Sequence, residues 1–588
     1  MTAPSLAEAD TAPVSQWPQE MRRLSRWVRR VGDKWRPYVL AVVLLAGVGS
    51  YVRVWLSDRG FWNDELCIAI NLRDLDFGQL TGPLKCKQIA PPAWLFVEKG
   101  LLQLTGPSEV GLRTFSMIAA ATALLLTATA ARRAVGRWGS VVAAALVVLS
   151  PMLVTYAGEL KQYTTEAAVA LMLLVVGDRF AADDRQDVHR SRRAGAWMVA
   201  GVVAAMFSYS ALIVLVGVVA AVVCFLSYRR RFVDLVFFVG ATIPVGILSA
   251  AVVLLRASQP RLENQDDFFP TGLPPAGAGP LELIGWLPRM WNGFVDAPLS
   301  WAFPFFALLL VVGGIVALAW RGKLLWAALL SAIFGAAVCA AALNGLPLQD
   351  RVALYLVAPA AIAVAACVDG AARGAVRVFA ALDQPIDPDI WWKRGRPMTS
   401  GLGVGLLAAF LLASVGGAAV VQPAAVGAYE ETQIPRYRDP GRDVLRDIAG
   451  KLRPGDRVLV YNFSAPLASW YGRQYAIPVV GLAKLKRAGT CQPKTVDRLF
   501  AGANRVWYVH GARLSTDPTD YTARVSAGLA GHGRIVASRV FPGSRQDAAS
   551  SWAPGWVLVD PHGGADPHPP RPPGNREFGC LALNLAPV

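Results

Sequence analysis

Long apolar runs, separated by short basic segments, dominate this chain up to residue 421. A helix needs roughly 17–25 apolar residues to cross a bilayer, and runs of about this length recur along the sequence. Only 17% of the 588 residues are charged, against about 25% in an ordinary soluble domain. We therefore expect a polytopic α-helical membrane protein with about eleven spans, at 38–56, 109–131, 138–156, 163–178, 194–208, 210–227, 232–255, 298–320, 324–344, 352–372 and 400–421.

The basic residues form clusters in every second loop between the apolar runs. In membrane proteins, loops rich in Lys and Arg stay on the cytoplasmic side. The alternation therefore predicts a multi-pass protein of the plasma (inner) membrane, with a cytoplasmic N-terminus and an extracytoplasmic C-terminal domain. The net charge of +17 arises largely in these loops, which argues against nucleic acid as a partner. The clusters lie at 22–30, 132–137, 190–193, 229–231, 321–323 and 373–396.

These assignments divide the chain into three parts. Residues 1–37 are a cytoplasmic segment, 38–421 a membrane domain, and 422–588 an extracytoplasmic domain, with long outer loops at 57–108 and 257–297. Strand-like and helical stretches alternate in the last part, which predicts a small α/β domain with a largely parallel sheet. The expected strands are 457–462, 477–481, 505–510, 534–541 and 555–559, and the expected helices are 441–452, 465–475, 495–501 and 520–529.

The cysteines give an independent indication of sidedness. Three of the seven lie inside predicted spans, where a thiol behaves as a small hydrophobe. The other four lie in outer segments, two in the first outer loop and two in the C-terminal domain. An oxidising compartment favours disulfides, so we expect the pairs Cys67–Cys86 and Cys491–Cys580. Four unrelated thiols are the alternative.

Two adjacent acids, Asp64 and Glu65, open the first outer loop close to the membrane surface. Such a pair can supply a general base and its partner. The alternative is structural, with Asn63 or Asp64 capping a helix that has Glu65 in its first turn. These residues alone favour neither interpretation.

Four polar residues, Glu159, Lys161, Tyr163 and Glu166, lie close together at the outer end of the third predicted span. Charged groups this near to hydrocarbon are costly unless they are paired or functional. Glu159 and Lys161 are also compatible with a loop ion pair of little energetic value. Glu166 lies a turn into an apolar helix, and for this reason we expect it to be functional.

A third polar group, Asp350 and Arg351 with Tyr355, lies at the outer end of the tenth predicted span. An arginine at this depth suits a phosphate, which its guanidinium group can bind through two hydrogen bonds. Snorkelling of the side chain to the interface is the alternative.

Together these features resemble the GT-C superfamily of membrane glycosyltransferases. The nearest branch is glycosyltransferase family 39, which contains protein O-mannosyltransferases and lipid A aminoarabinose transferases. The resemblance is clearest over residues ~38–180 and follows the span layout more loosely elsewhere. The motifs that carry it are Asp64-Glu65, Pro91-Pro92-Ala93-Trp94, Arg113, Glu159-Leu160-Lys161-Gln162-Tyr163, Glu166, and Asp350-Arg351 followed by Pro359.

The resemblance implies a polyprenyl-phosphate-linked sugar as donor and transfer on the outer face to an envelope glycan, lipid or protein. Asp64 would deprotonate the acceptor hydroxyl in a single inverting displacement, with Glu65 and Glu166 in the catalytic group, while cations stabilise the phosphate. Two acids near a phosphate permit a divalent cation, Mg²⁺ or Mn²⁺, without requiring one. We expect the further donor-binding residues to be Glu159, Lys161, Tyr163, Arg351 and Tyr355.

The sequence departs from this pattern at one position. Aminoarabinose transferases carry a lysine immediately before the proline of the interfacial helix, where this chain has Ala90. Lys85, Lys87 and Gln88 lie just upstream, and we expect them to reach the donor phosphate instead. A Cys67–Cys86 disulfide would tie this segment to the helix that begins at the acidic pair.

Two functions of other classes compete with this hypothesis. A transporter or flippase of envelope lipid precursors should contain internal repeats, or charges and broken helices near the bilayer midplane. The sequence contains no evident repeat, and its acids cluster toward the outer face. A non-catalytic scaffold for envelope assembly differs from the enzyme in its response to Asp64→Asn, which would leave the scaffold unaffected.

Overall fold

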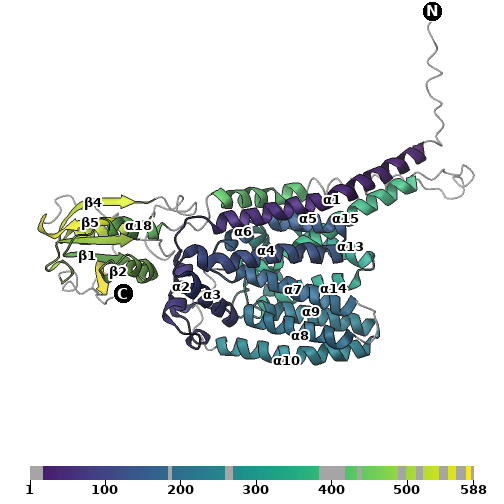
Figure 1. The fold of residues 1–588 in the computed structure, drawn as a ribbon, viewed down its shortest axis with the longest axis horizontal. Coiled ribbons are helices and arrows are strands. Elements are labelled where there is room, and N and C mark those ends of the chain that lie inside the picture. The colour runs from purple at the N-terminus through teal and green to yellow at the C-terminus, as the bar shows by residue number, and fades with distance from the viewer. Residues whose placement is uncertain are drawn as a thin grey trace, which may run out of the picture.

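The computed structural model consists of a helical bundle with a sheet-containing domain at one end (Figure 1). It describes residues 17–182, 189–257, 269–382, 417–433, 440–461, 464–487, 498–510, 521–541, 554–563 and 578–584. The predicted fold class, a polytopic α-helical membrane protein with a C-terminal α/β domain, is confirmed.

The bundle contains the helices that carry the predicted spans. Among the described residues, six helices are long and apolar enough to cross a membrane, or up to eight if each of two bent pairs is one span. The predicted number of about eleven stays a prediction, and residues 400–416 of its last span lie outside the described residues. The helices are α1 (Trp17–Trp55), α4 (Glu109–Ala134), α5 (Arg137–Val148), α6 (Pro151–Ala157), α7 (Tyr163–Ala182), α8 (Arg190–Phe207), α9 (Ala211–Tyr228), α10 (Phe232–Ala257), α12 (Pro280–Phe294), α13 (Pro304–Trp320), α14 (Leu324–Ala342) and α15 (Val357–Leu382).

The predicted span at 138–156 is broken, because α5 and α6 meet at an angle of 67°. Pro151 occupies the first turn of α6, and it has no N–H with which to continue the hydrogen bonding of α5. The Ser150 hydroxyl caps α6 by accepting a hydrogen bond from the Leu153 N–H at 3.4 Å. The bend directs α6 toward the segment that contains Glu159 and Lys161.

The first loop folds into short helices at one end of the bundle. Its apolar side chains, including Leu66 and Trp94, share one buried cluster with Trp470 of the C-terminal domain. The loop and this domain therefore pack as neighbours, which agrees with their positions in Figure 1. The helical elements of the loop are α2 (Asn63–Asp74), η1 (Gln79–Thr81), η2 (Lys85–Lys87) and α3 (Pro92–Thr105).

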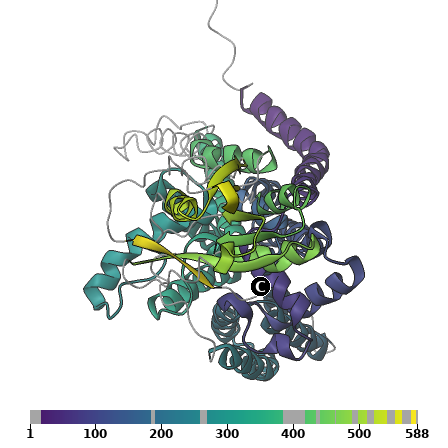
Figure 2. The ribbon, with the colours of Figure 1, turned by 90° about the vertical axis from the view of Figure 1, so that its left-hand side faces the viewer.

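The C-terminal domain, which faces the viewer in Figure 2, contains a sheet of six described strands. Their order is β4-β5-β3-β1-β2-β6. Among the strands that the structure describes, only β1–β2 and β1–β3 are parallel pairs, so the prediction of a largely parallel sheet was wrong. The chain returns from β4 to its direct neighbour β5, and such a return produces an antiparallel pair, whereas a parallel pair needs a crossover. The strands are β1 (Asp456–Tyr461), β2 (Val479–Arg487), β3 (Arg505–His510), β4 (Arg534–Val540), β5 (Gly555–Asp560) and β6 (Phe578–Asn584).

Helices of the C-terminal domain lie close to three of the four predicted positions. The expected helix at 495–501 falls partly outside the described residues, and strand β6 was not predicted. The helices are α18 (Gly441–Ala449), α19 (Ala465–Leu467) with the π-helical turn η7 (Ala468–Gly472), and α21 (Tyr521–Ala530).

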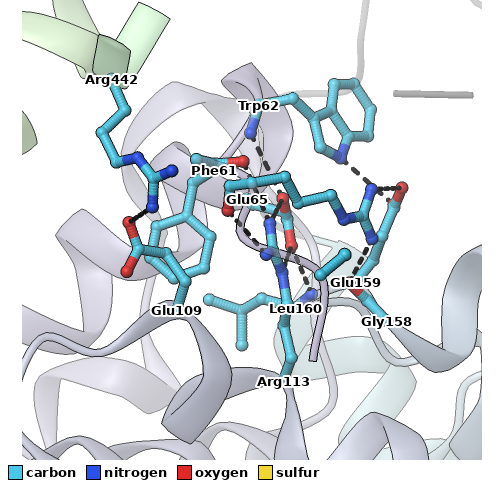
Figure 3. Close-up of polar contacts among 12 residues, drawn as sticks. Phe61, Trp62, Glu65, Glu109, Arg113, Gly158, Glu159, Leu160 and Arg442 are labelled. Carbon is cyan, nitrogen blue, oxygen red and sulfur yellow. Dashed lines mark hydrogen bonds and ion pairs between the residues drawn. The ribbon is translucent and has the colours of Figure 1, made fainter. Parts of the chain in front are cut away.

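Hydrogen bonds attach the C-terminal domain to the chain segment that enters α2. The Tyr471 hydroxyl accepts a hydrogen bond from the Phe61 N–H at 2.8 Å and donates one to Glu109 at 2.9 Å. Arg442 lies 2.8 Å from Asp58 and 3.4 Å from Glu109, and Figure 3 shows the second of these contacts. Because Asp58 and Phe61 directly precede α2, the domain helps to fix where this helix begins.

Candidate active site

Glu65 is fully buried and is held by Arg113 of α4 in a two-point ion pair (Figure 3). The Arg113 Nε and Nη2 atoms donate to the two carboxylate oxygens at 2.8 and 2.7 Å. The same carboxylate accepts hydrogen bonds from the N–H groups of Leu160 at 2.8 Å and Trp62 at 3.2 Å. Burial raises the pKa of Glu65, but the charge of Arg113 outweighs burial and holds it below its ordinary value. Glu65 thus joins α2, α4 and the segment after α6.

A second buried pair, Arg59 and Glu159, lies beside the first. Arg59 Nη1 is 3.5 Å from Glu159 Oε1, and Arg59 also donates to the Gly158 carbonyl. The Trp62 indole N–H donates to Glu159 at 3.1 Å. Burial raises the pKa of Glu159 above its ordinary value. The structure therefore pairs Glu159 with Arg59, where the sequence had suggested Lys161 as a loop ion-pair partner.

Asp64 has the environment expected of a reacting acid. Its side chain is 24% exposed, whereas those of Glu65 and Glu159 are fully buried. Its Oδ2 atom lies 3.6 Å from Lys161 Nζ and 3.5 Å from Arg351 Nη2. Burial raises the pKa of Asp64, but the charges of Lys161 and Arg351 outweigh burial, so the pKa is lowered from its ordinary value. Asp64 is therefore an accessible, ionised carboxylate at neutral pH.

Both cations beside Asp64 are held in place by other groups. Lys161 Nζ donates to Gln88 Oε1 at 2.8 Å, and its side chain is only 5% exposed. The Arg351 guanidinium group lies over the Trp62 ring at 5.8 Å from its centroid. Arg351 belongs to the 3₁₀ helix η5 (Asp350–Leu356), so residues distant in the sequence meet here. We call Asp64, Gln88, Lys161 and Arg351 the Asp64 cluster.

The two loop lysines that we expected at the donor phosphate take other positions. Lys85 Nζ lies 2.7 Å from Asp74, and half of its side chain is exposed. Lys87 is exposed as well. Of the three residues proposed from this segment, Gln88 is the one that the structure brings to the Asp64 cluster.

The remaining predicted residues lie on α7 and η5. The Tyr163 ring packs edge-on against Tyr156, with the centroids 4.9 Å apart. Glu166 is buried and lies near Ser210, which is between α8 and α9. Tyr355 is fully buried. Glu166 therefore faces the helices of the bundle, a turn beyond the loop that carries Lys161.

Arg59 and Trp62 were missed by the sequence analysis. Trp62 contacts both Glu159 and Arg351, and Arg59 contacts Glu159. Arg59 does leave a signal in the sequence, since it is an isolated arginine at the start of a loop on the side that the positive-inside rule leaves poor in arginine. Trp62 leaves none, because aromatic residues are common at any membrane interface.

The Cys67–Cys86 disulfide is present, as predicted, with a Cα–Cα distance of 5.9 Å. Asn71 supports the same connection, because its side chain accepts from the Lys85 N–H at 2.8 Å and donates to the Lys85 carbonyl at 3.3 Å. These contacts fix the segment that leads to Gln88 against α2. Cys491 of the second predicted pair lies outside the described residues.

Removing this disulfide is expected to destabilise the protein. The bridged cysteines are separated by 19 positions, and closing a loop of this size is worth about 3 kcal/mol. The variant Cys67→Ala/Cys86→Ala should therefore melt at a lower temperature in detergent. Cys224→Ala, which removes a free thiol, is the matched control. Equal melting temperatures for the double variant and the control would contradict the expectation.

An apolar cavity of about 540 Å³ lies among α12, α13 and α14. Aromatic side chains such as Trp291 and Phe334 form part of its wall. Leu348 and Leu356, which flank Arg351 along the chain, also line it. One end of the cavity is therefore formed by the same short element, η5, that supplies a cation to the Asp64 cluster.

Residues 90–254 match the model of one protein family, described as dolichyl-phosphate-mannose-protein mannosyltransferase. The match runs from the start of α3 into α10, so it includes Arg113 and Lys161 but neither Asp64 nor Arg351. No curated protein sequence matches the chain.

Solved structures that match the chain include ArnT from Cupriavidus metallidurans bound to undecaprenyl phosphate. It is 17% identical with a TM-score of 0.43, over 89% of this chain and 98% of that one. The apo oligosaccharyltransferase of Archaeoglobus fulgidus is 12% identical with a TM-score of 0.48, over 88% and 81%. The same organism's AglB, in complex with an inhibitory peptide and a dolichol-phosphate, is 13% identical with a TM-score of 0.42, over 82% and 70%.

Proposed function

We propose that this chain is a GT-C-type membrane glycosyltransferase that moves a sugar from a polyprenyl-phosphate donor to an acceptor of the cell envelope. The match of residues 90–254 to a mannosyltransferase family supports the proposal. The observation that carries the proposal is the position of Asp64, 3.6 Å from Lys161 and 3.5 Å from Arg351. An accessible carboxylate beside two cations combines a base for an acceptor hydroxyl with positive charge for a leaving phosphate. The acceptor is an envelope glycan, lipid or protein.

In this proposal Lys161 and Arg351 bind the donor phosphate. Both cations are largely buried, with side chains 5% and 19% exposed, so they are already positioned before the donor arrives. Gln88 holds the lysine and Trp62 the guanidinium group. A planar guanidinium group matches two phosphate oxygens, while the ammonium group acts as a compact charge. This assignment replaces Lys85 and Lys87 as the expected phosphate contacts.

The apolar cavity beside η5 suits the first isoprene units of the donor. Its volume of about 540 Å³ and its aliphatic and aromatic walls provide an apolar surface next to the phosphate site. Leu356 lies on the same 3₁₀ helix as Arg351, so a lipid in the cavity can present its phosphate to the guanidinium group.

Asp64 acts as the general base. The Asp64 carboxylate accepts the proton of the acceptor hydroxyl, whose oxygen attacks the anomeric carbon of the sugar. The bond between that carbon and the phosphate oxygen breaks, and polyprenyl phosphate leaves with the electron pair, stabilised by Lys161 and Arg351. A single displacement of this kind inverts the configuration of the anomeric carbon.

Glu65 and Glu159 position the reacting groups rather than react. The lone pairs of Glu65 already accept hydrogen bonds from Arg113, Leu160 and Trp62, and its side chain is closed to solvent. Glu159 orients Trp62, which in turn lies under Arg351. Glu166, which lies near Ser210, has no assigned part in the transfer step.

We place the Asp64 cluster on the outer side of the plasma membrane. A disulfide on the same loop suits an oxidising compartment, and the basic clusters lie at the other ends of α4 and α9. On this orientation the C-terminal domain is extracytoplasmic as well.

Mass spectrometry of membrane lipids and envelope glycans tests the function directly. A strain that lacks the protein should accumulate one polyprenyl-phosphate sugar and lose that sugar from one envelope component. Complementation with the wild-type chain should reverse both changes, and Asp64→Asn should not. A strain in which neither pool changes would refute the transferase proposal. Equal rescue by both chains would instead indicate a scaffold.

Arg351→Gln should weaken donor binding and shift the acid limb of the pH–rate profile. Losing a charged hydrogen-bond donor should raise the donor KM about ten-fold or more. The base works deprotonated, so activity falls as the pH drops through the pKa of Asp64. Arg351 lowers that pKa, so removing its charge should move the limb to higher pH. Initial rates measured across pH give both parameters.

Lys85→Gln is the matched control for this variant. Lys85 was expected at the phosphate from the sequence, but its ammonium group binds Asp74. Its KM and acid limb should equal those of the wild type. A shift for Lys85→Gln together with none for Arg351→Gln would reverse the assignment.

A further inference from the structure

A polar cavity of about 560 Å³ lies at the end of the bundle opposite the Asp64 cluster. Two helices connect the sites, because α4 and α7 begin beside the cluster and end at this cavity. The other walls come from the end of α9 and the start of α14, which pack against each other and against α7. In Figure 1 these helix ends lie on the side of the bundle away from the sheet.

Positive charge dominates the lining of this cavity. Four cations, Arg133, Arg229, Arg231 and Lys323, line it with one acid, Asp178. Asp178 already accepts a hydrogen bond from Arg133. Arg231 is likewise paired, with Asp234 at 2.8 Å.

Arg229 and Lys323 have no carboxylate within ion-pair distance among the residues that the structure describes. Arg229 instead lies over the Phe225 ring at 5.5 Å from its centroid. Both side chains are exposed at the rim of the cavity. Two exposed cations that form no ion pair with a described carboxylate attract an anion when they lie beside a membrane-spanning bundle.

Apolar side chains form the rest of the wall. They include Phe225, Leu324, Leu325 and Trp326, and Leu324 is exposed on the bundle surface. The glycerol and upper acyl carbons of a lipid bury apolar surface against such a wall, and this burial stabilises the bound lipid. A free inorganic anion has no apolar surface to bury there. Tryptophan is also characteristic of the depth at which lipid headgroups lie.

We propose that this cavity binds the phosphate of an anionic phospholipid from the leaflet opposite the Asp64 cluster. The phosphate lies between Arg229 and Lys323, and the glycerol and upper chains lie against Phe225 and Leu324. Arg133 and Arg231, which are paired with Asp178 and Asp234, form the rest of the polar wall. This site is separate from the donor site and does not depend on the proposed transferase activity.

Native mass spectrometry of the full chain in detergent tests this assignment. Titration with phosphatidylglycerol, with phosphatidylcholine as the zwitterionic comparison, gives the apparent affinity for each lipid. Each basic side chain near an anionic lipid contributes about five-fold in affinity. Arg229→Gln/Lys323→Gln should therefore bind phosphatidylglycerol at least ten-fold more weakly, with phosphatidylcholine binding unchanged.

Arg230→Gln is the control, because Arg230 neighbours Arg229 but does not line the cavity. It should bind phosphatidylglycerol like the wild type. The charge-conserving Arg229→Lys/Lys323→Arg should also retain binding, and this separates loss of charge from loss of folding. Equal phosphatidylglycerol binding by the wild type and the double Gln variant would overturn the proposal. Displacement of the lipid by millimolar inorganic phosphate would overturn it too, by indicating a site for free anions.

Discussion

Asp64→Asn is expected to lower the rate of sugar transfer by about 10²–10⁴-fold. Asparagine keeps the shape of the side chain but cannot accept the proton of the acceptor hydroxyl. Because Asp64 is partly exposed and its neighbours Lys161 and Arg351 are held by Gln88 and Trp62, the fold should tolerate the change. Transfer from a synthetic polyprenyl-phosphate sugar by the purified chain measures the loss.

The control for this variant is Asp74→Asn, which removes a carboxylate from the other end of α2. Asp74 pairs with Arg73 and Lys85, and these groups lie away from the Asp64 cluster. Its activity should stay within a few-fold of the wild type. If Asp64→Asn kept more than a tenth of the activity while melting at the wild-type temperature, Asp64 would not be the base.

Glu65→Gln should produce the largest loss of stability. The substitution leaves the guanidinium group of Arg113 fully buried without its counter-charge. Breaking a buried ion pair from one side typically costs about 3–5 kcal/mol. The variant should therefore melt at a clearly lower temperature and accumulate less in the membrane. It should also lose activity, since the pair connects α2 to α4 and to the segment that carries Lys161.

The double variant Glu65→Gln/Arg113→Met separates loss of the pair from loss of packing. Removing both charges should recover part of the melting temperature, because neither member of the pair is then left as an uncompensated buried charge. Asp33→Asn, which removes half of an exposed pair with Arg36, should cost no more than about 1 kcal/mol. If Glu65→Gln melted like Asp33→Asn, the buried pair would not be a structural element.

The sequence predicted the membrane fold because hydropathy and loop charge act locally along the chain. It also indicated the polar groups around Asp64, Lys161 and Arg351, since ionisable residues next to hydrocarbon are conspicuous. It did not indicate which lysine lies beside Asp64. The position of Lys161 depends on the bend between α5 and α6 at Pro151. The position of Lys85 depends on its ion pair with Asp74, which holds it away from Asp64.

The arrangement of the sheet could not be predicted for a similar reason. Short apolar stretches reveal strands, but strand direction depends on which neighbour each one pairs with. The alternation of strands and helices suggested crossovers throughout, whereas β4, β5 and β6 all pair antiparallel. The buried partner of Glu65 could not be predicted either. Arg113 is 48 positions away, and only the packing of α2 on α4 brings the two residues together.

The hydrogen bonds of Tyr471 have a consequence for how the protein matures. Its hydroxyl binds Phe61 and Glu109, which precede it by 410 and 362 positions. The ribosome therefore completes α2 and the start of α4 long before it adds Tyr471, the residue that holds the entrance to α2. Until Tyr471 is in place, α2 lacks the hydrogen bond from the C-terminal domain that helps to fix where the helix begins. The protein therefore becomes able to catalyse transfer only at the end of its synthesis. A chain truncated before the sheet should insert into the membrane but show no transferase activity.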